Sequence, residues 1–450
     1  MATTTHAAIT TAGGLAWRNW GGNQTCRPLS LEKPASEAEI VELVRGAAER
    51  GERVKIFGAG HSFTDIACTE GRLVSMDGYG RILKVDAEAA TIKVEAGISI
   101  ARLGEILERH GLAQPNLGDI AYQSIAGAIS TATHGTGARL GNIATQVKAL
   151  SLVTADGSLL ECSAEQNPDV FNAARVSLGA LGVISTVTLK CVPSFTLQSV
   201  QTPRRLDEVL EQIDELTAQN DHFEFFWVPH SDRVLAIANN RTEAPPNPPG
   251  RISAYYNDML MENHAFGLLQ RLGRARTSWI PGLGRLTAKL LSSREVVDRS
   301  HRIFANERIV RFVEMEYALP REALAGAVRE VRSMIDQKGL RISFPVEVRV
   351  ARGDDIWLST ASGRETCYVA VHVFQGLPFE AYFREVEAIM NGHAGRPHWG
   401  KMHYQIAATL RPRYPHWDDF VKIRDRLDPE GRFSNDYLDR VLGPAPAASR

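Results

Sequence analysis

Apolar and polar positions in the first 190 residues follow two periods, one typical of helices and one typical of strands. Residues 36–50 carry apolar side chains at helical spacing behind a capping-box pattern of Ser36 and Glu39, which predicts a helix. Residues 100–110 show the same spacing and end at Gly111, a residue that favours helix termination. Short apolar or alternating runs predict strands at 54–57, 82–85, 91–94, 149–154 and 182–189.

The second half continues this mixture after Pro193. Strands are predicted for an aromatic run and two apolar runs, at 223–228, 342–350 and 367–374. Helices are predicted for three amphipathic stretches, at 206–216, 320–337 and 379–391. The interleaved order predicts an α+β fold with two domains, one over 1–193 and one over 194–450.

The stretch 266–291 combines large apolar side chains with basic ones. Its apolar members are Leu268, Leu269, Leu272, Trp279, Ile280 and Leu283, and its basic members are Arg271, Arg274, Arg276, Arg285 and Lys289. Such a stretch could lie on an anionic membrane surface as a peripheral contact. A packed pair of amphipathic helices broken at Pro281 explains the same pattern and is the simpler interpretation.

Overall composition narrows the range of functions. The chain has 450 residues, with 51 Lys and Arg against 52 Asp and Glu, so its formal net charge is −1. Binding to nucleic acid needs a basic surplus on one face, and this balance argues against such a partner. No apolar run reaches the roughly 20 residues that cross a bilayer. Residues 1–16 lack the basic start and apolar centre of a signal peptide.

The cysteines indicate a reducing compartment. They are odd in number, widely spaced and without a CxxC pair, at Cys26, Cys68, Cys162, Cys191 and Cys367. We therefore expect neither a disulfide framework nor a cysteine zinc site, and we expect a cytoplasmic location. His398 and His403 have no further ligands at suitable spacing, so no metal ion is expected.

Two glycine-rich segments are candidate cofactor sites. Residues 58–62 follow a predicted strand, and their small side chains would let backbone N–H groups turn toward an anion such as a pyrophosphate. The segment lacks the third glycine of a nicotinamide fingerprint, which disfavours a Rossmann domain and leaves an ordinary tight turn as the alternative. Residues 124–137 alternate small residues with hydroxyls, and their few apolar side chains favour a buried cofactor-binding segment over a solvent loop.

The segment 346–350 alternates valines with charges. In a strand, Glu347 and Arg349 share one face while the valines occupy the other. Facing a pocket, the arginine would stabilise developing negative charge and the glutamate would bond a hydroxyl. A solvated strand face would show the same pattern. Lys401 follows a loop stiffened by proline and tryptophan, and is a candidate for a fixed cation.

Together these segments resemble the aldonolactone oxidoreductases of the vanillyl-alcohol oxidase flavoprotein family. The resemblance covers nearly the whole chain, from Asn19 to Leu438, and is greatest to L-gulono-1,4-lactone oxidases and dehydrogenases. The resemblance rests on five motifs, which follow one another at spacings similar to those in the family: GHSFTDIACT (60–69), ATHGTGARL (132–140), ARVSLGALGVISTVTL (174–189), PVEVR (345–349) and GRPHWGK (395–401).

The resemblance implies a PCMH-type FAD-binding domain over 1–193 and a cap or substrate domain over 194–450 whose C-terminal segment returns to the flavin. His61 matches the position that carries a covalent bond to the flavin C8 methyl in many relatives, so covalent histidyl-FAD is expected. The other residues expected to contact FAD are Gly58, Ala59, Gly60, Ser62, Gly118, Asp119, Ser124, Gly127, Ala128, Thr131, Val183 and Ile184.

The same resemblance implies oxidation of the C2 alcohol of an aldonolactone, in which L-gulono-1,4-lactone would give L-ascorbate. The C2 hydride would pass to flavin N5. Glu347 would orient the hydroxyl or take its proton, and Arg349 would stabilise the developing negative charge. Lys401 would bind substrate oxygens, with His398 also at the substrate.

The electron acceptor and the substrate stay open at this stage. Gly118 matches a position that is Gly in several relatives that use O2, which favours an oxidase, but similar dehydrogenases also have Gly there. O2 and a cytochrome or dye are therefore both retained as acceptors. An alditol oxidase and a D-arabinono- or L-galactono-1,4-lactone oxidoreductase are the alternative enzymes. A sugar-acid-binding flavoprotein is the alternative without catalysis.

Overall fold

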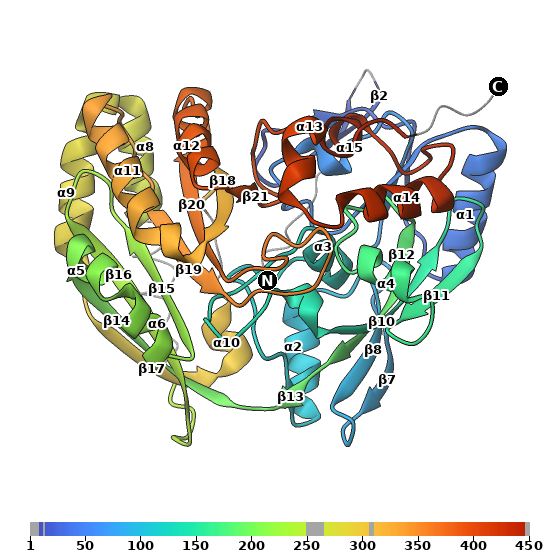
Figure 1. The fold of residues 1–450 in the computed structure, drawn as a ribbon, viewed down its shortest axis with the longest axis horizontal. Helices are drawn as coiled ribbons and strands as arrows, with labels where there is room; N and C mark the ends of the chain where they lie inside the picture. Colours follow the sequence, from blue (N-terminus) through green and yellow to red (C-terminus); the bar gives the residue numbers. More distant parts are fainter. Residues whose placement is uncertain (1–8, 12–13, 249–264, 306–309, 446–450) are drawn as a thin grey trace.

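The computed structural model describes residues 9–11, 14–248, 265–305 and 310–445, which fold into two lobes (Figure 1). Most of the stretch inspected for a signal peptide, 1–8 and 12–13, lies outside the described residues. Within the described ranges, no helix combines the length and the apolar character needed to span a bilayer.

The N-terminal lobe is built on two main sheets. A parallel sheet of order β4-β6-β5 contains β4 (Ser30–Glu32), β5 (Val54–Phe57) and β6 (Arg72–Ser75). An antiparallel sheet of order β11-β10-β12-β8-β7 contains β7 (Ile82–Asp86), β8 (Thr91–Glu95), β10 (Val147–Val153), β11 (Leu159–Ser163) and β12 (Val183–Lys190). Short strands complete the lobe: β1 (Ile9–Thr11), β2 (Gly14–Arg18), β3 (Thr25–Cys26), β9 (Leu112–Ala113) and β13 (Val192–Pro193).

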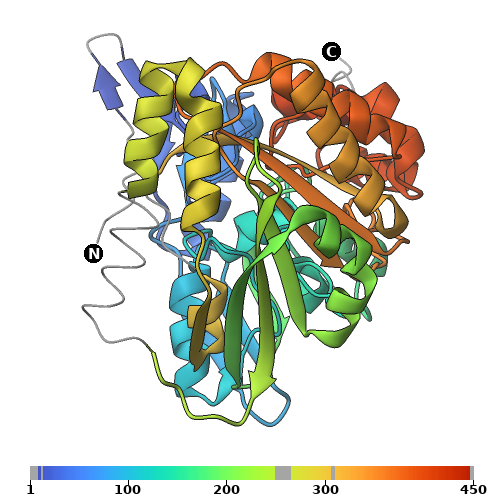
Figure 2. The same ribbon diagram turned by 90° about the vertical axis from the view of Figure 1, so that its left-hand side faces the viewer.

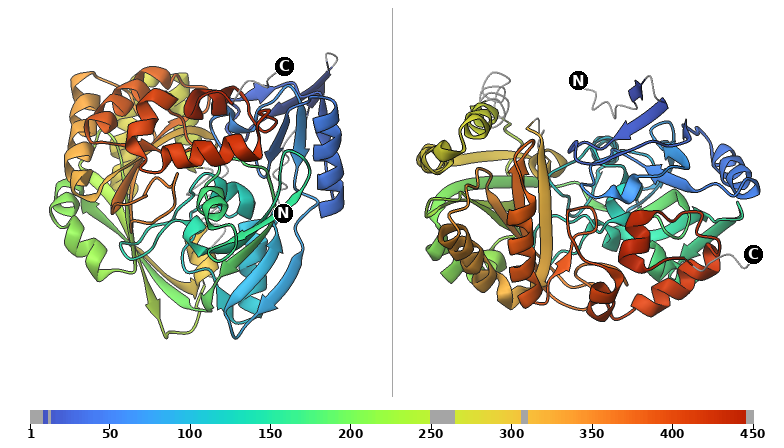
Figure 3. Two further views of the ribbon diagram at one scale, coloured as in Figure 1. Left: turned by 45° about the vertical axis from the view of Figure 1, so that its right-hand side comes forward. Right: turned by 90° about the horizontal axis from the view of Figure 1, so that it is seen from above.

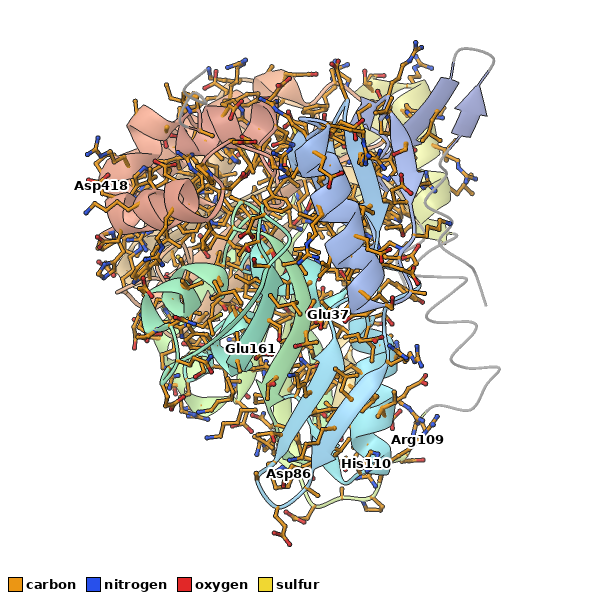
Figure 4. All side chains as sticks on the ribbon, turned by 90° about the vertical axis from the view of Figure 1, so that its right-hand side faces the viewer. Glu37, Asp86, Arg109, His110, Glu161 and Asp418 are labelled. Atoms are coloured by element: carbon orange, nitrogen blue, oxygen red, sulfur yellow. The ribbon has the colours of Figure 1, made fainter. Side chains whose placement is uncertain are left out.

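Four helices accompany these sheets: α1 (Glu37–Glu49), α2 (Ile100–Arg109), α3 (Ile125–Ser130) and α4 (Pro168–Ala174). Ser36 caps α1 as its pattern predicted, because its Oγ accepts the N–H of Glu39 at 3.2 Å. The outer side of the lobe carries both signs of charge, with Asp86, Arg109 and Glu161 among its exposed or partly exposed side chains (Figure 4).

The second lobe is built on one antiparallel sheet of eight strands in the order β17-β14-β16-β15-β19-β20-β18-β21. Its strands are β14 (Thr196–Arg205), β15 (His222–Trp227), β16 (Arg233–Thr242), β17 (Arg294–Arg299), β18 (Phe312–Pro320), β19 (Val346–Ala351), β20 (Thr366–Phe374) and β21 (Arg396–Pro397). Its helices are α5 (Leu206–Glu211), α6 (Ile213–Gln219), α8 (Phe266–Ala275), α9 (Ile280–Leu290), α10 (Ser300–Phe304), α11 (Leu324–Gln337) and α12 (Glu380–Gly392).

The two faces of this sheet differ in character. The valines of β19 are at most 1% exposed and share one core with side chains of α11 and α12, which cover the outer face of the sheet (Figure 1). Glu347 and Arg349 alternate with these valines and therefore point to the opposite face. That face turns toward the N-terminal lobe, where Arg349 meets Asp119.

The C-terminal segment crosses back to the N-terminal lobe (Figure 3). It carries α13 (Ala407–Leu410), α14 (Trp417–Leu427) and α15 (Asp436–Leu442). Trp417, Phe420 and Tyr437 of this segment join the core of the N-terminal lobe. The buried Lys55 on β5 donates to the Phe433 carbonyl at 2.9 Å, so the segment is also tied to the parallel sheet.

We propose residues 1–193 as one domain and 194–450 as the other, with the C-terminal segment returning to the first. Two large separate cores, one in each lobe, support this division. The pairing of β13 with β9 ends the first lobe, and β14 begins the second only three residues later.

Most predicted elements are confirmed, and several predictions are wrong. The helix predicted over 206–216 is two short helices that meet at Gln212. The glycine-rich segment from 124, for which no helix was predicted, contains α3, and β18, which carries two acidic side chains, had no predicted counterpart. The helix predicted from 320 begins at Leu324, and the strand predicted from 342 begins at Val346.

Candidate active site

A cavity lies in the N-terminal lobe where the loop after β5, the start of α3 and the start of β12 meet. Most residues predicted to contact FAD line it: Gly58, Ala59, Gly60, His61, Ser62, Ser124, Gly127, Thr131, Val183 and Ile184. These residues come from three segments that are far apart in the sequence. The fold therefore brings both glycine-rich segments to one site.

The close approach of these segments explains the glycine at position 58. A Cβ on Gly58 would lie 2.0 Å from Ser124 Oγ and 2.8 Å from Ser124 Cβ, so no larger residue fits. Ser124 itself caps α3 and accepts the Gly127 N–H at 3.2 Å. Within the described chain, the N–H groups of Ala59, Gly60 and Ser62 donate no hydrogen bond. This arrangement of donors and small residues fits a pyrophosphate-containing cofactor such as FAD.

Three of the residues predicted to contact FAD do not line this cavity. Ala128 is fully buried in α3. Gly118 packs against the His134 carbonyl, which a Cβ would approach to 2.9 Å. Asp119 points to the cap instead and forms an ion pair with Arg349. His61 does line the cavity, and its ring centroid lies 5.3 Å from that of Trp20.

Arg349 is the centre of a cluster of carboxylates. Its Nε donates to Glu224 Oε2 at 2.6 Å and lies 2.6 Å from Glu347 Oε1, while Nη2 pairs with Asp119. The side chain of Arg349 is only 7% exposed, so water screens these interactions little. We call Arg349, Asp119, Glu224 and Glu347 the Arg349 cluster. It joins the cap sheet to the N-terminal lobe.

Lys401 occupies a second ion pair beside this cluster. Its Nζ pairs with Glu314 of β18 and lies 5.3 Å from the ring centroid of Phe63. His372 of β20 connects the two sites, because its Nε2 lies 3.6 Å from Glu314 Oε1 and 4.0 Å from Glu347 Oε2. The fold thus brings the three predicted catalytic residues, Glu347, Arg349 and Lys401, into one neighbourhood.

Burial and neighbouring charges shift the pKa values of these carboxyls in opposite directions. Burial raises the pKa of Glu224 to about 8 against the opposing charge of Arg349. Burial also raises the pKa of Glu347. In Glu314, burial is the largest cause and acts in the same direction, but Lys401 and His372 together outweigh it and lower the pKa to about 2. At a given pH, the carboxyl groups of Glu224 and Glu347 beside Arg349 therefore hold a proton more readily than the carboxyl group of Glu314 beside Lys401.

A third group, His134, Glu316 and His398, has the residue types of a metal site. Their ligand atoms lie within 4.8 Å of one another. However, His134 uses both ring nitrogens in hydrogen bonds at 2.9 Å, one with Glu316 Oε1 and one with the Gly135 carbonyl. His398 Nδ1 accepts the Gly400 N–H at 3.1 Å. Burial lowers the pKa of His398 to about 4, so this predicted substrate residue is a neutral, buried side chain.

A second, smaller cavity opens beside the Arg349 cluster. Its polar lining comes from Asp119, Thr136, Ser199, Gln201, Glu224, Asn239 and Arg349. Hydroxyl, amide and carboxylate groups in such a number suit a ligand with several hydroxyl groups.

Sequence reasoning missed Glu224, Glu314 and His372. Glu224 lies within an aromatic strand, and Glu314 alternates with buried apolar residues on β18, which also carries Glu316, so each was a charge among mainly apolar neighbours. That signal marks a buried functional charge, because unpaired charges are rarely buried.

Two family descriptions match the chain. The D-arabinono-1,4-lactone oxidase family matches residues 187–441, which is more than half of the chain. The FAD binding domain family matches residues 28–163.

Several curated relatives match along nearly the whole chain. L-Gulono-1,4-lactone dehydrogenase of Mycobacterium tuberculosis is 49% identical over 432 residues, covering 95% of this chain and 99% of the relative. L-Gulonolactone oxidase of Bos taurus is 39% identical over 440 residues, covering 95% and 98%. Alditol oxidase of a Streptomyces species is 31% identical over 443 residues, covering 94% and 98%.

Among solved structures, cholesterol oxidase from B. sterolicum superposes with a TM-score of 0.82 at 19% identity, over 95% of this chain and 96% of that chain. This likeness concerns the fold alone and confirms the predicted α+β fold with an FAD-binding domain and a cap. The resemblance inferred from the five motifs is confirmed by the relatives. The chain therefore belongs to the D-arabinono-1,4-lactone oxidase family, FAD-linked oxidoreductases that act on CH–OH groups.

Proposed function

We propose that this protein oxidises the C2 alcohol of an aldonolactone, with L-gulono-1,4-lactone as the preferred substrate and L-ascorbate as the final product. The Arg349 cluster carries the proposal, because it sets a buried cation and a carboxylate base beside a cavity with a polar lining. The dehydrogenase and the oxidase named above, 49% and 39% identical to this chain, support the choice of lactone.

The loop and helix that meet at Gly58 and Ser124 would hold FAD, which when bound would supply the acceptor for the hydride that leaves C2. The residues of this chain would accept the hydroxyl proton and stabilise the negative charge on the substrate. Glu347 takes the hydroxyl proton, and its raised pKa makes it a stronger base than an exposed carboxylate. Arg349 stabilises the negative charge that develops on the substrate oxygen. Lys401 binds lactone or hydroxyl oxygens and is held in place by Glu314.

We also propose a covalent bond between His61 and FAD. The location of His61 in the cavity wall, between Gly60 and Ser62 of the cradle, supports it. Acid precipitation tests it: flavin colour should stay with the wild-type pellet and move to the supernatant in His61→Ala. Wild-type colour found entirely in the supernatant would exclude the bond.

The acceptor is O2 or a cytochrome- or dye-type partner. Gly118 leaves no room for a methyl group, since a Cβ would lie 2.9 Å from the His134 carbonyl. Stopped-flow mixing of the reduced protein with O2 distinguishes the acceptors. Fast reoxidation identifies an oxidase, whereas slow reoxidation beside fast dye reduction identifies a dehydrogenase.

A substrate panel tests the proposed reaction. L-Gulono-, L-galactono- and D-arabinono-1,4-lactone are compared with xylitol and sorbitol, by anaerobic bleaching of the flavin. We expect the highest kcat/KM for L-gulono-1,4-lactone. A higher value for another lactone would correct the substrate and keep the reaction.

A sugar-alcohol oxidase is the second candidate, favoured by the 31% identity to alditol oxidase. Faster bleaching by xylitol or sorbitol than by any lactone would establish it. Protein that purifies with flavin but is bleached by none of these compounds would indicate a sugar-acid-binding flavoprotein instead.

We further propose a cytoplasmic location. The five cysteines have free thiols, two of them half-buried and three buried, which suits a reducing compartment. Thiol labelling of protein in freshly lysed cells should detect five reduced cysteines after denaturation.

A further inference from the structure

The face of the cap sheet that carries the Arg349 cluster continues with polar side chains on two further strands. Asn239 of β16 and Ser199 of β14 are direct register partners, so their side chains lie next to each other on one face. Glu224 pairs with Ile237, two residues before Asn239, and therefore shares this face. All four side chains line the cavity beside the cluster. Figure 2 shows β14 and β16 in shades of green beside the orange strands of the same sheet.

Asn239 is buried with an unused hydrogen-bond acceptor. It is only 6% exposed, and its Oδ1 accepts no hydrogen bond from the part of the chain that the structure describes. A buried polar group without a partner destabilises a protein, so such groups usually meet another side chain, a water molecule or a ligand. Because Asn239 lies in the cavity wall, a ligand in that cavity can supply the missing donor.

Asn240, the next residue, has different surroundings. Its side chain lies on the other face of β16, because side chains alternate along a strand. Its Oδ1 accepts the Asp221 N–H at 2.8 Å, and its Nδ2 donates to Asn220 Oδ1 at 2.7 Å. The asparagine that faces away from the cavity is thus bonded at both ends of its amide, whereas the Oδ1 of Asn239 is not.

The position of Asn239 suits the far end of a bound lactone. Neighbouring strands lie about 4.8 Å apart, so β16, two strands from β19, places Asn239 roughly 10 Å from the backbone of Glu347. A lactone of six carbons that lies over the sheet with its C2 hydroxyl at Glu347 covers most of this distance. Its exocyclic hydroxyls would then approach Asn239, whose amide offers both a donor and an acceptor to a hydroxyl group.

We propose that Asn239, with Ser199 beside it, binds the exocyclic hydroxyls of the lactone and selects substrates that carry them. This role rests on the proposed oxidation of an aldonolactone and adds a specificity determinant on the cap, away from the reacting carbon. A site built around a hydrogen bond discriminates strongly against an analogue without the hydroxyl, because the polar group of the protein is then left unpaired. The substrate class is thereby narrowed to lactones with a hydroxylated side chain.

Paired substrates test the proposal on the full-length flavoprotein. Anaerobic flavin bleaching is measured with L-gulono-1,4-lactone and with its 5,6-dideoxy analogue, which keeps the ring and the C2 alcohol. The variant Asn239→Leu removes the amide at similar volume, and Ser199→Ala removes the neighbouring hydroxyl. Asn240→Leu is the matched control, because it makes the same change on the other face of the same strand.

We expect the wild type to prefer the hydroxylated lactone by roughly 100-fold in kcat/KM. In Asn239→Leu this preference should fall by roughly tenfold or more, through a higher KM for the hydroxylated lactone, while the dideoxy analogue reacts as in wild type. Ser199→Ala should lower the preference by a smaller factor, and Asn240→Leu should keep it. Damage to the fold alone would slow both lactones equally.

Three results would overturn the proposal and leave the proposed oxidation intact: equal kcat/KM values of the two lactones in the wild type, an unchanged preference in Asn239→Leu, or an equal loss of preference in Asn240→Leu. Where Asn239→Leu does not fold, an unchanged preference in Ser199→Ala is equally decisive. A wild-type flavin that neither lactone bleaches would refute the proposed function itself, and the role of Asn239 with it.

Discussion

Arg349 is surrounded by more carboxyl groups than the single charge of its guanidinium can neutralise. Three carboxyl groups surround it, and all four side chains are at most 20% exposed. Burying so many charges is costly unless one of them is neutral. The raised pKa of Glu224, about 8, provides this relief, because Glu224 then holds its proton at neutral pH. Glu347 and Asp119 remain to hold the arginine in position.

Replacing Arg349 should slow the chemistry severely. Without the guanidinium, Glu347 would lose its partner at 2.6 Å, and in the proposed reaction the substrate oxygen would lose its stabilising charge. We expect Arg349→Ala to lower the rate of anaerobic flavin reduction by roughly 100-fold or more, the scale of one lost charge stabiliser. Arg352→Ala, an exposed arginine close in the chain, is the control and should reduce at the wild-type rate. Near wild-type reduction in Arg349→Ala would remove this residue from the mechanism.

The stability of the protein should depend on the ionisation of Glu224. Its pKa is about 8 in the folded protein, against an ordinary value of 4.5, so between these values the folded state binds more protons than the unfolded state. Stability contributed by this group is therefore lost as pH rises through that window. Glu224→Gln cannot ionise, so the difference in melting temperature, wild type minus variant, should fall with increasing pH. A difference that is constant across the window would contradict the raised pKa.

Glu314 should act on binding more than on chemistry, since it positions Lys401. We expect Glu314→Gln to raise KM for the lactone roughly tenfold while the limiting rate of flavin reduction changes less. The matched control is Glu385→Gln, which breaks an exposed pair with Lys338 at 2.5 Å. A fall in the limiting rate with unchanged KM would instead give Glu314 a part in the chemical step.

At this scale, local patterns predicted only part of the site. Alternation along one strand sufficed to bring Glu347 and Arg349 to one face. Glu224 reaches Arg349 because β15 pairs with β19, with Phe225 opposite Val348. Glu314 meets His372 because they are paired residues of β18 and β20. Such long-range strand pairing is not visible in the periodicity of a single segment.

Among the elements, the contact between the loop after β5 and α3 defines the cofactor cradle. Gly58→Ala should reduce flavin content, because the new Cβ would overlap Ser124 Oγ at 2.0 Å. Adding Ser124→Gly should restore it, since glycine at a helix N-cap costs only a few tenths of a kcal/mol. The ratio of flavin to protein absorbance measures the effect.

Gly392→Ala is the control for this pair of variants, because a Cβ there meets nothing within 4 Å. It should keep the wild-type flavin content. A Gly58→Ala protein with full flavin content would show that the loop and α3 can separate without cost, contrary to the account.

The wrong predictions at the element scale have local causes. α3 is only six residues long and is rich in small residues. Six residues contain too few apolar positions for a helical repeat to be recognised in the sequence. The stretch 206–216 has continuous apolar spacing, but the chain turns at Gln212 and restarts as α6. The contacts of α5 with β14 and of α6 with β15 determine where these two helices lie, more than the spacing of their apolar residues does.

For the whole molecule, the return of the C-terminal segment completes the site. Lys401 lies at the crossing between lobes, where the Phe63 N–H donates to the Gly400 carbonyl at 2.7 Å. The segment then adds Trp417, Phe420 and Tyr437 to the core of the N-terminal lobe. The near-neutral net charge of −1 suits a neutral lactone, which needs no long-range attraction. The crossing of the C-terminal segment back to the N-terminal lobe was predicted only from the family resemblance of the motifs, because no local sequence pattern indicates it.

Oxidation at C2 is the central claim, and a kinetic isotope effect in a single turnover tests it most directly. Anaerobic flavin bleaching is followed with L-gulono-1,4-lactone that carries deuterium at C2, and with the same lactone labelled at C3. The account predicts that deuterium at C2 slows bleaching several-fold, whereas deuterium at C3 leaves the rate unchanged. Equal rates for the C2-labelled and unlabelled lactone, or a flavin that no lactone bleaches, would contradict it.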